Sequence, residues 1–367
     1  MKEAFLREKL EERKTAGAFR QLRLPVAAID FCSNDYLGLA RSLPAIGGAN
    51  GSTGSRLLSG HTREAAELET FLAAFHDAEA ALVFNSGYDA NLSLLSSLPA
   101  RGDTVLYDQL AHASIRDGIR LGFGKGISFL HNDVADLEKK LQTQGQGRCF
   151  VVTESVFSMD GDMAPLAEIA AVCDRYNAHL LVDEAHGFGV LGERGEGLVQ
   201  SLGLASACLA RVYTYGKAAG VHGACIAGSV VLKDFLVNFA RPFIFTTAPP
   251  PHALLAIGQA YTAVAAAGTQ RAHLQELIQY FREALIPLRK LDSVTAIQGV
   301  VVPGNEAVKQ LAARLQEAGY DVRPILYPTV PKGSERLRIV LHAYNTMEEL
   351  EGLVRLLQSV PEADHQQ

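Results

Sequence analysis

Short apolar runs alternate with amphipathic segments through the first two thirds of the chain. Helical patterns separate most of the runs, among them residues 64–76, a segment beginning near Asp89, and residues 165–176. Continuous apolar strands that alternate with helices are typical of a largely parallel sheet covered on both faces, with ligands bound beyond the carboxyl ends of its strands. After a short strand at 28–31, the runs predict strands at residues 80–84, 104–107, 127–130, 149–153, 179–182, 211–214 and 224–228.

The last third of the chain has a different pattern. The proline-rich segment 240–251 is a natural break, and a long helix is expected at 252–288. A smaller α+β unit follows, with strands near 294–301, 322–326 and 337–341. We therefore predict an N-terminal helical arm, residues 1–35, a large domain, residues 36–251, and an interdomain helix with a small C-terminal domain, residues 252–367.

Two segments near the termini and one loop complete this prediction. Residues 2–20 predict a charged helix with Phe5, Leu6 and Leu10 on one side, which would pack on something else, such as a second subunit. The glycine-rich stretch 47–60 predicts a loop that a partner or ligand must order, and residues 361–367 predict a frayed tail.

Composition narrows the class of function. The net charge of −6 and the lack of long Lys/Arg blocks argue against a nucleic-acid or anionic-membrane partner, so small molecules are expected. The five cysteines are scattered and never spaced as C-x-x-C, which indicates neither a disulfide framework nor a structural metal site. A charged N-terminus without an apolar core, and no apolar run of about 20 residues, lead us to expect a cytoplasmic protein with no membrane span.

An acid and a lysine stand at the ends of two predicted strands. Asp183 ends the buried run that starts at His179, and Lys217 lies in a stretch of small residues after the strand 211–214. Such a lysine can form a Schiff base, and such an acid can keep a pyridinium nitrogen protonated, so together they suggest pyridoxal 5'-phosphate (PLP). Taken alone, Asp183 could instead form a salt bridge or cap a helix, although the cofactor role is the favoured interpretation.

Other polar residues follow neighbouring strands. Ser86, Gly87 and Tyr88 stand between a strand and a helix, where backbone N–H groups favour a phosphate, although an ordinary turn would look the same. Three further residues follow strands: His112 could stack on the cofactor ring, and Ser158 and His186 could contact its phenolic oxygen. Each is a weak signal alone, but their shared place at the carboxyl ends of strands strengthens the prediction.

Two competing motifs are rejected. Gly187, Gly189 and Gly192 match the dinucleotide pattern G-x-G-x-x-G, but the residues after them cannot start a good helix, and no acid follows at the required distance. Tyr213 and Lys217 match the Y-x-x-x-K spacing of short-chain dehydrogenases, but no glycine-rich nucleotide loop precedes them.

Several motifs in combination identify the chain as similar to the α-oxoamine synthases, a family of fold-type I PLP enzymes. The resemblance covers about residues 31–344. The segments that carry it are Ser33-Asn-Asp-Tyr-Leu-Gly-Leu39, Leu58-Ser-Gly-His61, Thr153-Glu-Ser-Val-Phe-Ser-Met-Asp-Gly-Asp162, Val182-Asp-Glu-Ala-His-Gly187 and Tyr215-Gly-Lys217.

The resemblance implies a role for each matching position. Lys217 would bind PLP covalently, Asp183 would contact the ring nitrogen, His112 would stack on the ring, and Arg338 would bind the amino-acid carboxylate, with Arg336 the weaker candidate on the other face of its strand. The catalytic residues would be Lys217, His112, Asp183 and His186. The phosphate would be contacted by Ser86, Gly87, Tyr88 and Thr214, and the phenolic oxygen by Ser158 and His186. The neighbouring subunit's cofactor would be contacted by Thr246 or Thr247, and Asn34 would lie near the substrate.

The resemblance also implies a fold and a reaction. The fold would be a fold-type I PLP-dependent transferase, α/β, with a mostly parallel seven-stranded sheet in the large domain and a smaller C-terminal α+β domain, in a homodimer. The reaction would be the decarboxylative condensation of an amino acid with an acyl thioester. Glycine C-acetyltransferase and serine palmitoyltransferase-like activities remain open, because Leu326 and Tyr327 replace a basic residue common in relatives and the region before Ser52 is short for the family.

Overall fold

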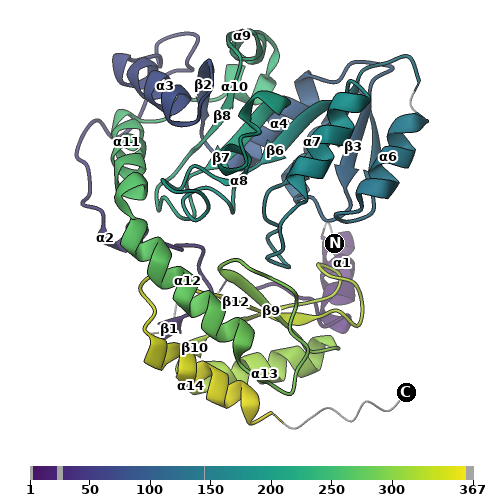
Figure 1. The fold of residues 1–367 in the computed structure, drawn as a ribbon, viewed down its shortest axis with the longest axis vertical. Coiled ribbons are helices and arrows are strands. Elements are labelled where there is room, and N and C mark those ends of the chain that lie inside the picture. The colour runs from purple at the N-terminus through teal and green to yellow at the C-terminus, as the bar shows by residue number, and fades with distance from the viewer. Residues whose placement is uncertain (1–2, 23–27, 144, 361–367) are drawn as a thin grey trace. The chain divides into compact units, whose positions relative to one another are not determined.

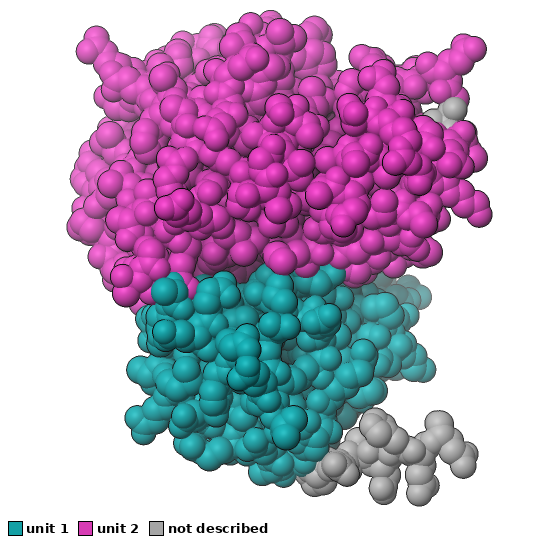
Figure 2. Space-filling model, viewed as in Figure 1, with its two compact units in different colours: residues 1–34, 159–162, 272–367 teal, residues 35–158, 163–271 magenta. Residues whose placement is uncertain are grey.

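The computed structural model describes residues 3–22, 28–143 and 145–360, and within them the chain divides into two units (Figure 2). Unit 1 comprises residues 1–34, 159–162 and 272–367, and unit 2 comprises residues 35–158 and 163–271. Unit 1 thus combines segments from both ends of the chain with a short excursion from its middle. The three functional domains that we predicted from the sequence stay a prediction.

The apolar runs of unit 2 form one seven-stranded sheet, ordered β2-β8-β7-β6-β5-β3-β4 (Figure 1). β8 is antiparallel to both of its neighbours, and every other pair is parallel, which confirms the mostly parallel sheet predicted from the sequence. The strands are β2 (Ala80–Phe84), β3 (Thr104–Asp108), β4 (Lys125–Phe129), β5 (Cys149–Glu154), β6 (His179–Asp183), β7 (Cys208–Thr214) and β8 (Ala224–Gly228).

Alternate residues of these strands enter two separate cores, one on each face of the sheet. Phe150, Val152 and Leu181 pack with the side chains of helices α4 (Gly87–Ser97), α5 (Ala113–Leu121), α9 (Val230–Phe239) and α10 (Arg241–Ile244). Val151 and Val182 pack on the opposite face, with helices α6 (Val134–Gln142) and α7 (Leu166–Arg175). Since side chains alternate along a strand, the polar residue at each strand's end has a predictable face.

Helices connect and cover the strands of unit 2. Several begin at a polar N-cap: the Ser86, Asp133 and Ser229 side chains each accept a backbone N–H of the following turn. The helices are α2 (Leu39–Ser42), α3 (Arg63–Phe75), α4 (Gly87–Ser97), α5 (Ala113–Leu121), α6 (Val134–Gln142), α7 (Leu166–Arg175), α8 (Leu198–Ser201), η1 (Ala205–Ala207), α9 (Val230–Phe239), α10 (Arg241–Ile244) and α11 (Pro251–Ala266).

Unit 1 contains a three-stranded antiparallel sheet, ordered β11-β12-β9, and a parallel pair, β1 with β10. Its helices bury apolar side chains such as Phe281 and Leu353. This agrees with the predicted smaller α+β unit. The elements are α1 (Ala4–Thr15), β1 (Ile29–Asp30), α12 (Gly268–Glu283), which begins in unit 2, β9 (Ile297–Val301), α13 (Asn305–Glu317), β10 (Tyr320–Asp321), β11 (Arg323–Ile325), β12 (Arg336–Val340) and α14 (Met347–Gln358).

Two predicted helices differ from the structure. The single helix expected at 252–288 is two helices, α11 and α12, because Ala267 has a ψ of 33°, outside the helical region, and glycine follows it. The helix expected at 2–20 spans only Ala4–Thr15, and Gly17, at φ 62°, turns the chain after it. Residue 2 and the predicted tail 361–367 lie outside the described residues.

Candidate active site

Asp183 is a buried carboxylate at the carboxyl end of β6. It shares the sheet face of Leu181, toward α4 and α5, and is 5% exposed. Asn91 Nδ2 donates to Asp183 Oδ2 at 2.7 Å, and the backbone N–H of Ala185 donates to Oδ1 at 2.9 Å. Among the described residues these are the hydrogen bonds of the Asp183 carboxylate, and both donors are neutral. Because a buried charge is costly without a charged partner, a cation that binds beside Asp183 would stabilise this carboxylate.

Lys217 lies in the turn after β7, partly buried. Its Nζ donates to Oγ1 of Thr214, the last residue of β7, at 3.0 Å. Gly87 approaches the same threonine so closely that a Cβ on Gly87 would lie 2.2 Å from Thr214 Cγ2. The structure thus gives Gly87 a second reason to be glycine, in addition to the close approach of a phosphate expected from the sequence.

The N-terminus of α4 is built by Ser86, as the sequence indicates. Ser86 Oγ accepts the backbone N–H of Asp89 at 3.1 Å and donates to Asp89 Oδ2 at 2.9 Å. Tyr88 is exposed and donates from Oη to Asp117 Oδ2 at 2.5 Å, a hydrogen bond that raises the pKa of Tyr88. Since the first N–H groups of a helix lack intrahelical acceptors, this end of α4 suits an anion.

His112 caps α5 and keeps an open face toward solvent. Its Nδ1 accepts the backbone N–H of Ser114 at 3.2 Å and lies 2.7 Å from Ser114 Oγ. Ser114 Oγ in turn accepts from Asn91 Nδ2 at 3.0 Å, so one network joins His112 to the amide that holds Asp183. Desolvation of the ring lowers the pKa of His112; the charge of Asp183 opposes this shift and that of Lys217 adds to it.

His186 and Ser158 follow β6 and β5 respectively. His186 is buried, and its Nδ1 lies 2.6 Å from Oη of Tyr36, which is itself buried. Ser158 lies in the turn that follows the bridge between Val156 and Met163.

Thr246 and Thr247 lie in the loop after α10. Asn85 Nδ2 donates to Thr246 Oγ1 at 3.3 Å and to the Thr247 carbonyl at 3.0 Å. Because Asn85 precedes Ser86, the loop that we expect to serve a neighbouring subunit is attached to the turn that begins α4.

The two residues predicted to bind substrate contact each other in unit 1. Arg338 donates from Nη2 to Asn34 Oδ1 at 2.9 Å. Arg336 lies two residues before Arg338 on β12 and therefore shares its face, so the expectation that the two arginines lie on opposite faces is wrong. Arg336 forms an ion pair with Asp160. The guanidinium of Arg336 is therefore committed to a carboxylate, which favours Arg338 as the residue that recognises the amino acid.

The residues of unit 2 fit PLP by the chemistry of their donor set. Asp183 is a buried carboxylate held by neutral donors, Lys217 is an amine beside a threonine hydroxyl, and Ser86 caps a helix that can receive a phosphate. His112 adds an exposed ring at the edge of the same network. Among the described residues, no group of three or more His, Cys, Asp and Glu side chains could hold a metal ion.

Comparisons with known proteins agree with this chemistry. Residues 26–357 match the model of the family described as aminotransferase class I and II. The 8-amino-7-oxononanoate synthase of Emericella nidulans is 41% identical over 96% of this chain and 94% of its own length. The chain belongs to the class I and II aminotransferase family. Its assignment from sequence to the PLP-dependent α-oxoamine synthases is confirmed.

Solved structures show the same fold for this aminotransferase family member. A serine palmitoyltransferase of S. paucimobilis with bound PLP has a TM-score of 0.86 at 27% identity, covering 97% of this chain and 96% of that one. The 8-amino-7-oxononanoate synthase of Francisella tularensis has a TM-score of 0.78 at 30% identity, covering 90% of this chain and 97% of that one. The fold-type I class and the PLP cofactor predicted from the sequence are confirmed.

Sequence reasoning missed the residues that hold this family's motif residues in place. Asn91 and Ser114 link Asp183 to His112, Tyr36 contacts His186, and Glu154 accepts the backbone N–H of His112 at 2.6 Å. Tyr36 and Glu154 stand inside segments that carry the resemblance, which is the signal that could have found them. Asn91 and Ser114 carry no such signal.

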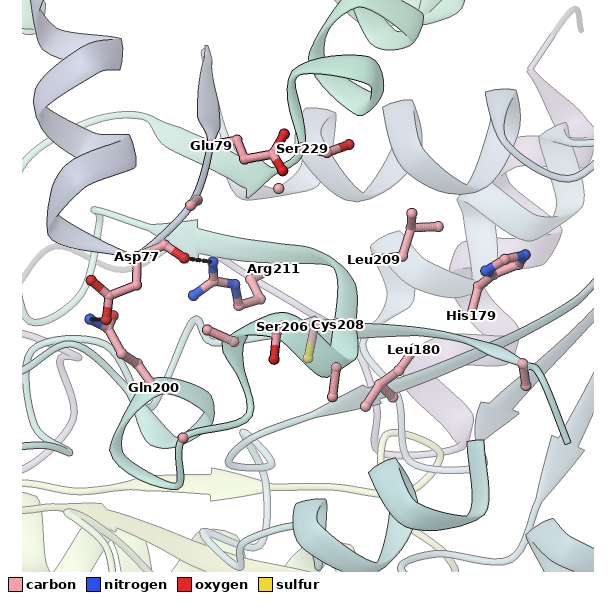
Figure 3. Close-up of a pocket in the computed structure, with 16 residues that line it drawn as sticks. Asp77, Glu79, His179, Leu180, Gln200, Ser206, Cys208, Leu209, Arg211 and Ser229 are labelled. Atoms are coloured by element: carbon pink, nitrogen blue, oxygen red, sulfur yellow. Dashed lines mark hydrogen bonds between the residues drawn. The ribbon is translucent and has the colours of Figure 1, made fainter. Parts of the chain in front are cut away.

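A cavity of about 730 Å³ lies elsewhere in unit 2 (Figure 3). It is lined by His179 and Cys208, which begin β6 and β7, so it adjoins the amino ends of these strands and not their carboxyl ends. Arg211 Nη2 donates to the Asp77 carbonyl there at 3.3 Å. None of the predicted site residues lines it.

No helix in the described part of the chain is long and apolar enough to cross a membrane.

Proposed function

We propose that the chain catalyses the decarboxylative condensation of L-alanine with a pimeloyl thioester, which gives 8-amino-7-oxononanoate, carbon dioxide and a free thiol. The acyl carrier would be coenzyme A or acyl carrier protein, and the reaction belongs to biotin synthesis. The observation that carries the proposal is a buried Asp183 held by neutral donors, in one unit with Lys217, in a chain whose curated relative carries this synthase name.

The residues of unit 2 would hold the cofactor and move one proton. Bound PLP supplies an electron sink for the α-carbon of the amino acid. Asp183 would keep a proton on the ring nitrogen, because its carboxylate lacks a cationic partner among the described residues. Lys217 would hold the cofactor covalently and, once released, take the α-proton with its amine. His112 would stack on the ring from its exposed face.

Further contacts would orient the cofactor. Ser158 and His186 would contact the phenolic oxygen, with the His186 ring fixed by Tyr36. The phosphate would lie at the N-terminus of α4, where the dipole of the helix favours an anion. The residues proposed to contact it are Ser86, Gly87, Tyr88 and Thr214.

Arg338 would bind the amino-acid carboxylate through a planar two-pronged contact, and Asn34 would fix the guanidinium. Their contact supports a shared role, because an arginine whose plane is fixed loses less freedom on binding.

We further propose a cytoplasmic homodimer in which Thr246 or Thr247 serves the partner's cofactor. Exposed apolar side chains support an interface: Val231, Phe239 and Phe245 of unit 2 are 77%, 61% and 72% exposed. Phe5 and Leu10 of α1 are also exposed, consistent with a helix that packs on another chain. The five cysteines are all free thiols, as is usual in a reducing compartment.

A serine palmitoyltransferase-like activity is the second candidate, since such an enzyme has the higher of the two TM-scores. The 41% identity to an 8-amino-7-oxononanoate synthase favours the first. Glycine C-acetyltransferase activity is the third, by family resemblance alone.

One assay separates these candidates. Thiol release is followed with L-alanine, glycine or L-serine as the amino acid and pimeloyl-, acetyl- or palmitoyl-CoA as the thioester, with protein purified in excess PLP. We expect release that requires L-alanine and pimeloyl-CoA, is absent in Lys217→Ala, and yields 8-amino-7-oxononanoate by mass spectrometry. Release only with glycine and acetyl-CoA, or only with L-serine and palmitoyl-CoA, would replace the proposed function. If pimeloyl-CoA is inert, pimeloyl-acyl carrier protein tests the other carrier.

A further inference from the structure

Glu154 is a buried glutamate that joins the ends of three neighbouring strands. It is the last residue of β5, which lies between β3 and β6 in the sheet, and it is 2% exposed. Toward the β3 side, its Oε1 accepts the backbone N–H of His112 at 2.6 Å. Toward the β6 side, it stands in ladder register with Asp183.

The register places two carboxyl groups side by side on one face. Glu154 has the parity of Phe150 and Val152, and Asp183 has the parity of Leu181, so both point toward α4 and α5. Neighbouring strands are about 4.8 Å apart, and two buried carboxylates at such a separation do not both ionise readily. One proton shared by the pair is the ordinary solution in proteins.

The hydrogen bonds decide which of the two keeps the charge. Both oxygens of Asp183 accept from N–H donors, an arrangement that favours the anion. Within the described part of the chain, the Glu154 carboxyl group accepts one hydrogen bond, from the His112 N–H. Burial and then the charge of Asp183 hold the pKa of Glu154 well above its ordinary value of 4.5; the His112 N–H and Lys217 oppose this shift, and Asp108 adds to it.

We propose that Glu154 is a positioning residue that acts as a neutral carboxylic acid. Its carbonyl oxygen fixes the start of α5, and with it the ring of His112, while the single negative charge of the pair stays on Asp183 for the cofactor ring nitrogen. The inference rests on the PLP site and not on the identity of the acyl substrate. Both of its tests are therefore made without substrates, and their outcome is separate from that of the thiol-release assay.

The first test asks directly whether Glu154 carries a proton. Infrared difference spectra at neutral pH compare full-length wild-type protein with Glu154→Gln. We expect the variant to lose a C=O stretching band typical of a protonated carboxyl group. Glu69→Gln is the matched control: Glu69 is also 2% exposed, but Arg56 and Lys233 form ion pairs with it, so no such band should be lost. No lost band in Glu154→Gln would overturn the proposal.

The second test separates position from charge by PLP affinity, measured from the visible absorption of the bound cofactor. Glutamine is a neutral isostere that still offers a carbonyl to the His112 N–H, so Glu154→Gln should bind PLP within about threefold of wild type. Glu154→Ala leaves that N–H without its acceptor and should weaken binding by about tenfold or more. Binding in Glu154→Gln as weak as in Glu154→Ala would show that an ionised carboxylate is needed. Should the alanine variant fail to fold, the glutamine variant and the infrared test still decide.

Discussion

The contact between Gly87 and Thr214 makes a testable link between the phosphate end of the site and its lysine. Gly87 is the first residue of α4, and an alanine there would place its Cβ 2.2 Å from Thr214 Cγ2. To reach the 3.4 Å of an ordinary contact, the two atoms must separate by 1.2 Å. Gly87 has no positive φ, so alanine suits its backbone, and the cost comes from this collision.

The size of the effect follows from two opposing contributions. Overpacking a well-packed site costs about 1–3 kcal/mol. Replacing glycine by alanine at a position whose backbone suits alanine raises the free energy of unfolding by about 0.4–1 kcal/mol. The difference spans about 0–2.6 kcal/mol, and we expect Gly87→Ala to lower the free energy of unfolding by about 1–2 kcal/mol, the middle of that range. The same displacement of the Thr214 side chain would disturb its 3.0 Å hydrogen bond to Lys217 Nζ, so PLP affinity should fall as well.

Urea unfolding and PLP titration measure the two effects, and a second substitution tests their cause. Thr214→Ser removes Cγ2 but keeps the hydroxyl that Lys217 contacts. In the double variant, Gly87→Ala should therefore be partly rescued, with a coupling energy of about 1–2 kcal/mol. If Gly87→Ala is neutral in both assays, or if Thr214→Ser does not relieve it, the reasoning about this contact is wrong.

Four further predictions follow from the described contacts. Lys217→Ala should fold normally but show no borohydride-trapped cofactor; trapping in the variant would contradict the role of Lys217. Asp183→Asn should bind PLP at least about tenfold more weakly, since the carboxylate that compensates the ring charge is lost; PLP titration checks this. Arg338→Lys should raise the KM for the amino acid with little change in the free energy of unfolding. Arg336→Lys should mainly lower the free energy of unfolding, because it disturbs the ion pair with Asp160. The reverse pattern would exchange the roles of the two arginines. Burial, and then the charge of Arg211, hold the pKa of His76 well below its ordinary 6.5. As the pH is lowered through about 6.5, the unfolded chain therefore binds this proton before the folded chain does, and the free energy of unfolding should decrease by up to about 1.4 kcal/mol per pH unit. His76→Phe should flatten that slope in urea unfolding measured against pH.

The elements of the sheet were predictable from the sequence because buried strands leave a plain local signal. β2 and β8 match their predicted bounds, and the other strands of unit 2 differ by a few residues at their ends. The helix expected at 252–288 was wrong because its apolar pattern continues past Ala267, while the break depends on backbone torsions at a single residue. Periodicity reports which face is apolar and does not report where a helix is interrupted.

The residues that support the site were not predictable in the same way. Asn91 lies 92 positions from Asp183, and Glu154 lies 42 positions from His112, so each hydrogen bond depends on how distant strands are ordered in the sheet. The sequence predicts that strands exist, but it does not by itself give their order.

Strand alternation nevertheless connects the local pattern to the chemistry. Thr214, Asp183 and Glu154 each end a strand on the parity that faces α4 and α5, and these three strands, β7, β6 and β5, are consecutive in the sheet. Apart from His179, which begins β6, the strand positions of this parity before them are apolar, so the polar side chain appears where the strand ends. The same rule puts Arg336 and Arg338 on one face of β12 and does not distinguish them, and the charge partner of Arg336, Asp160, comes from a four-residue excursion that no periodicity reveals. Alternation thus predicts which side chains share a face, while the three-dimensional structure decides which of their charges are already paired.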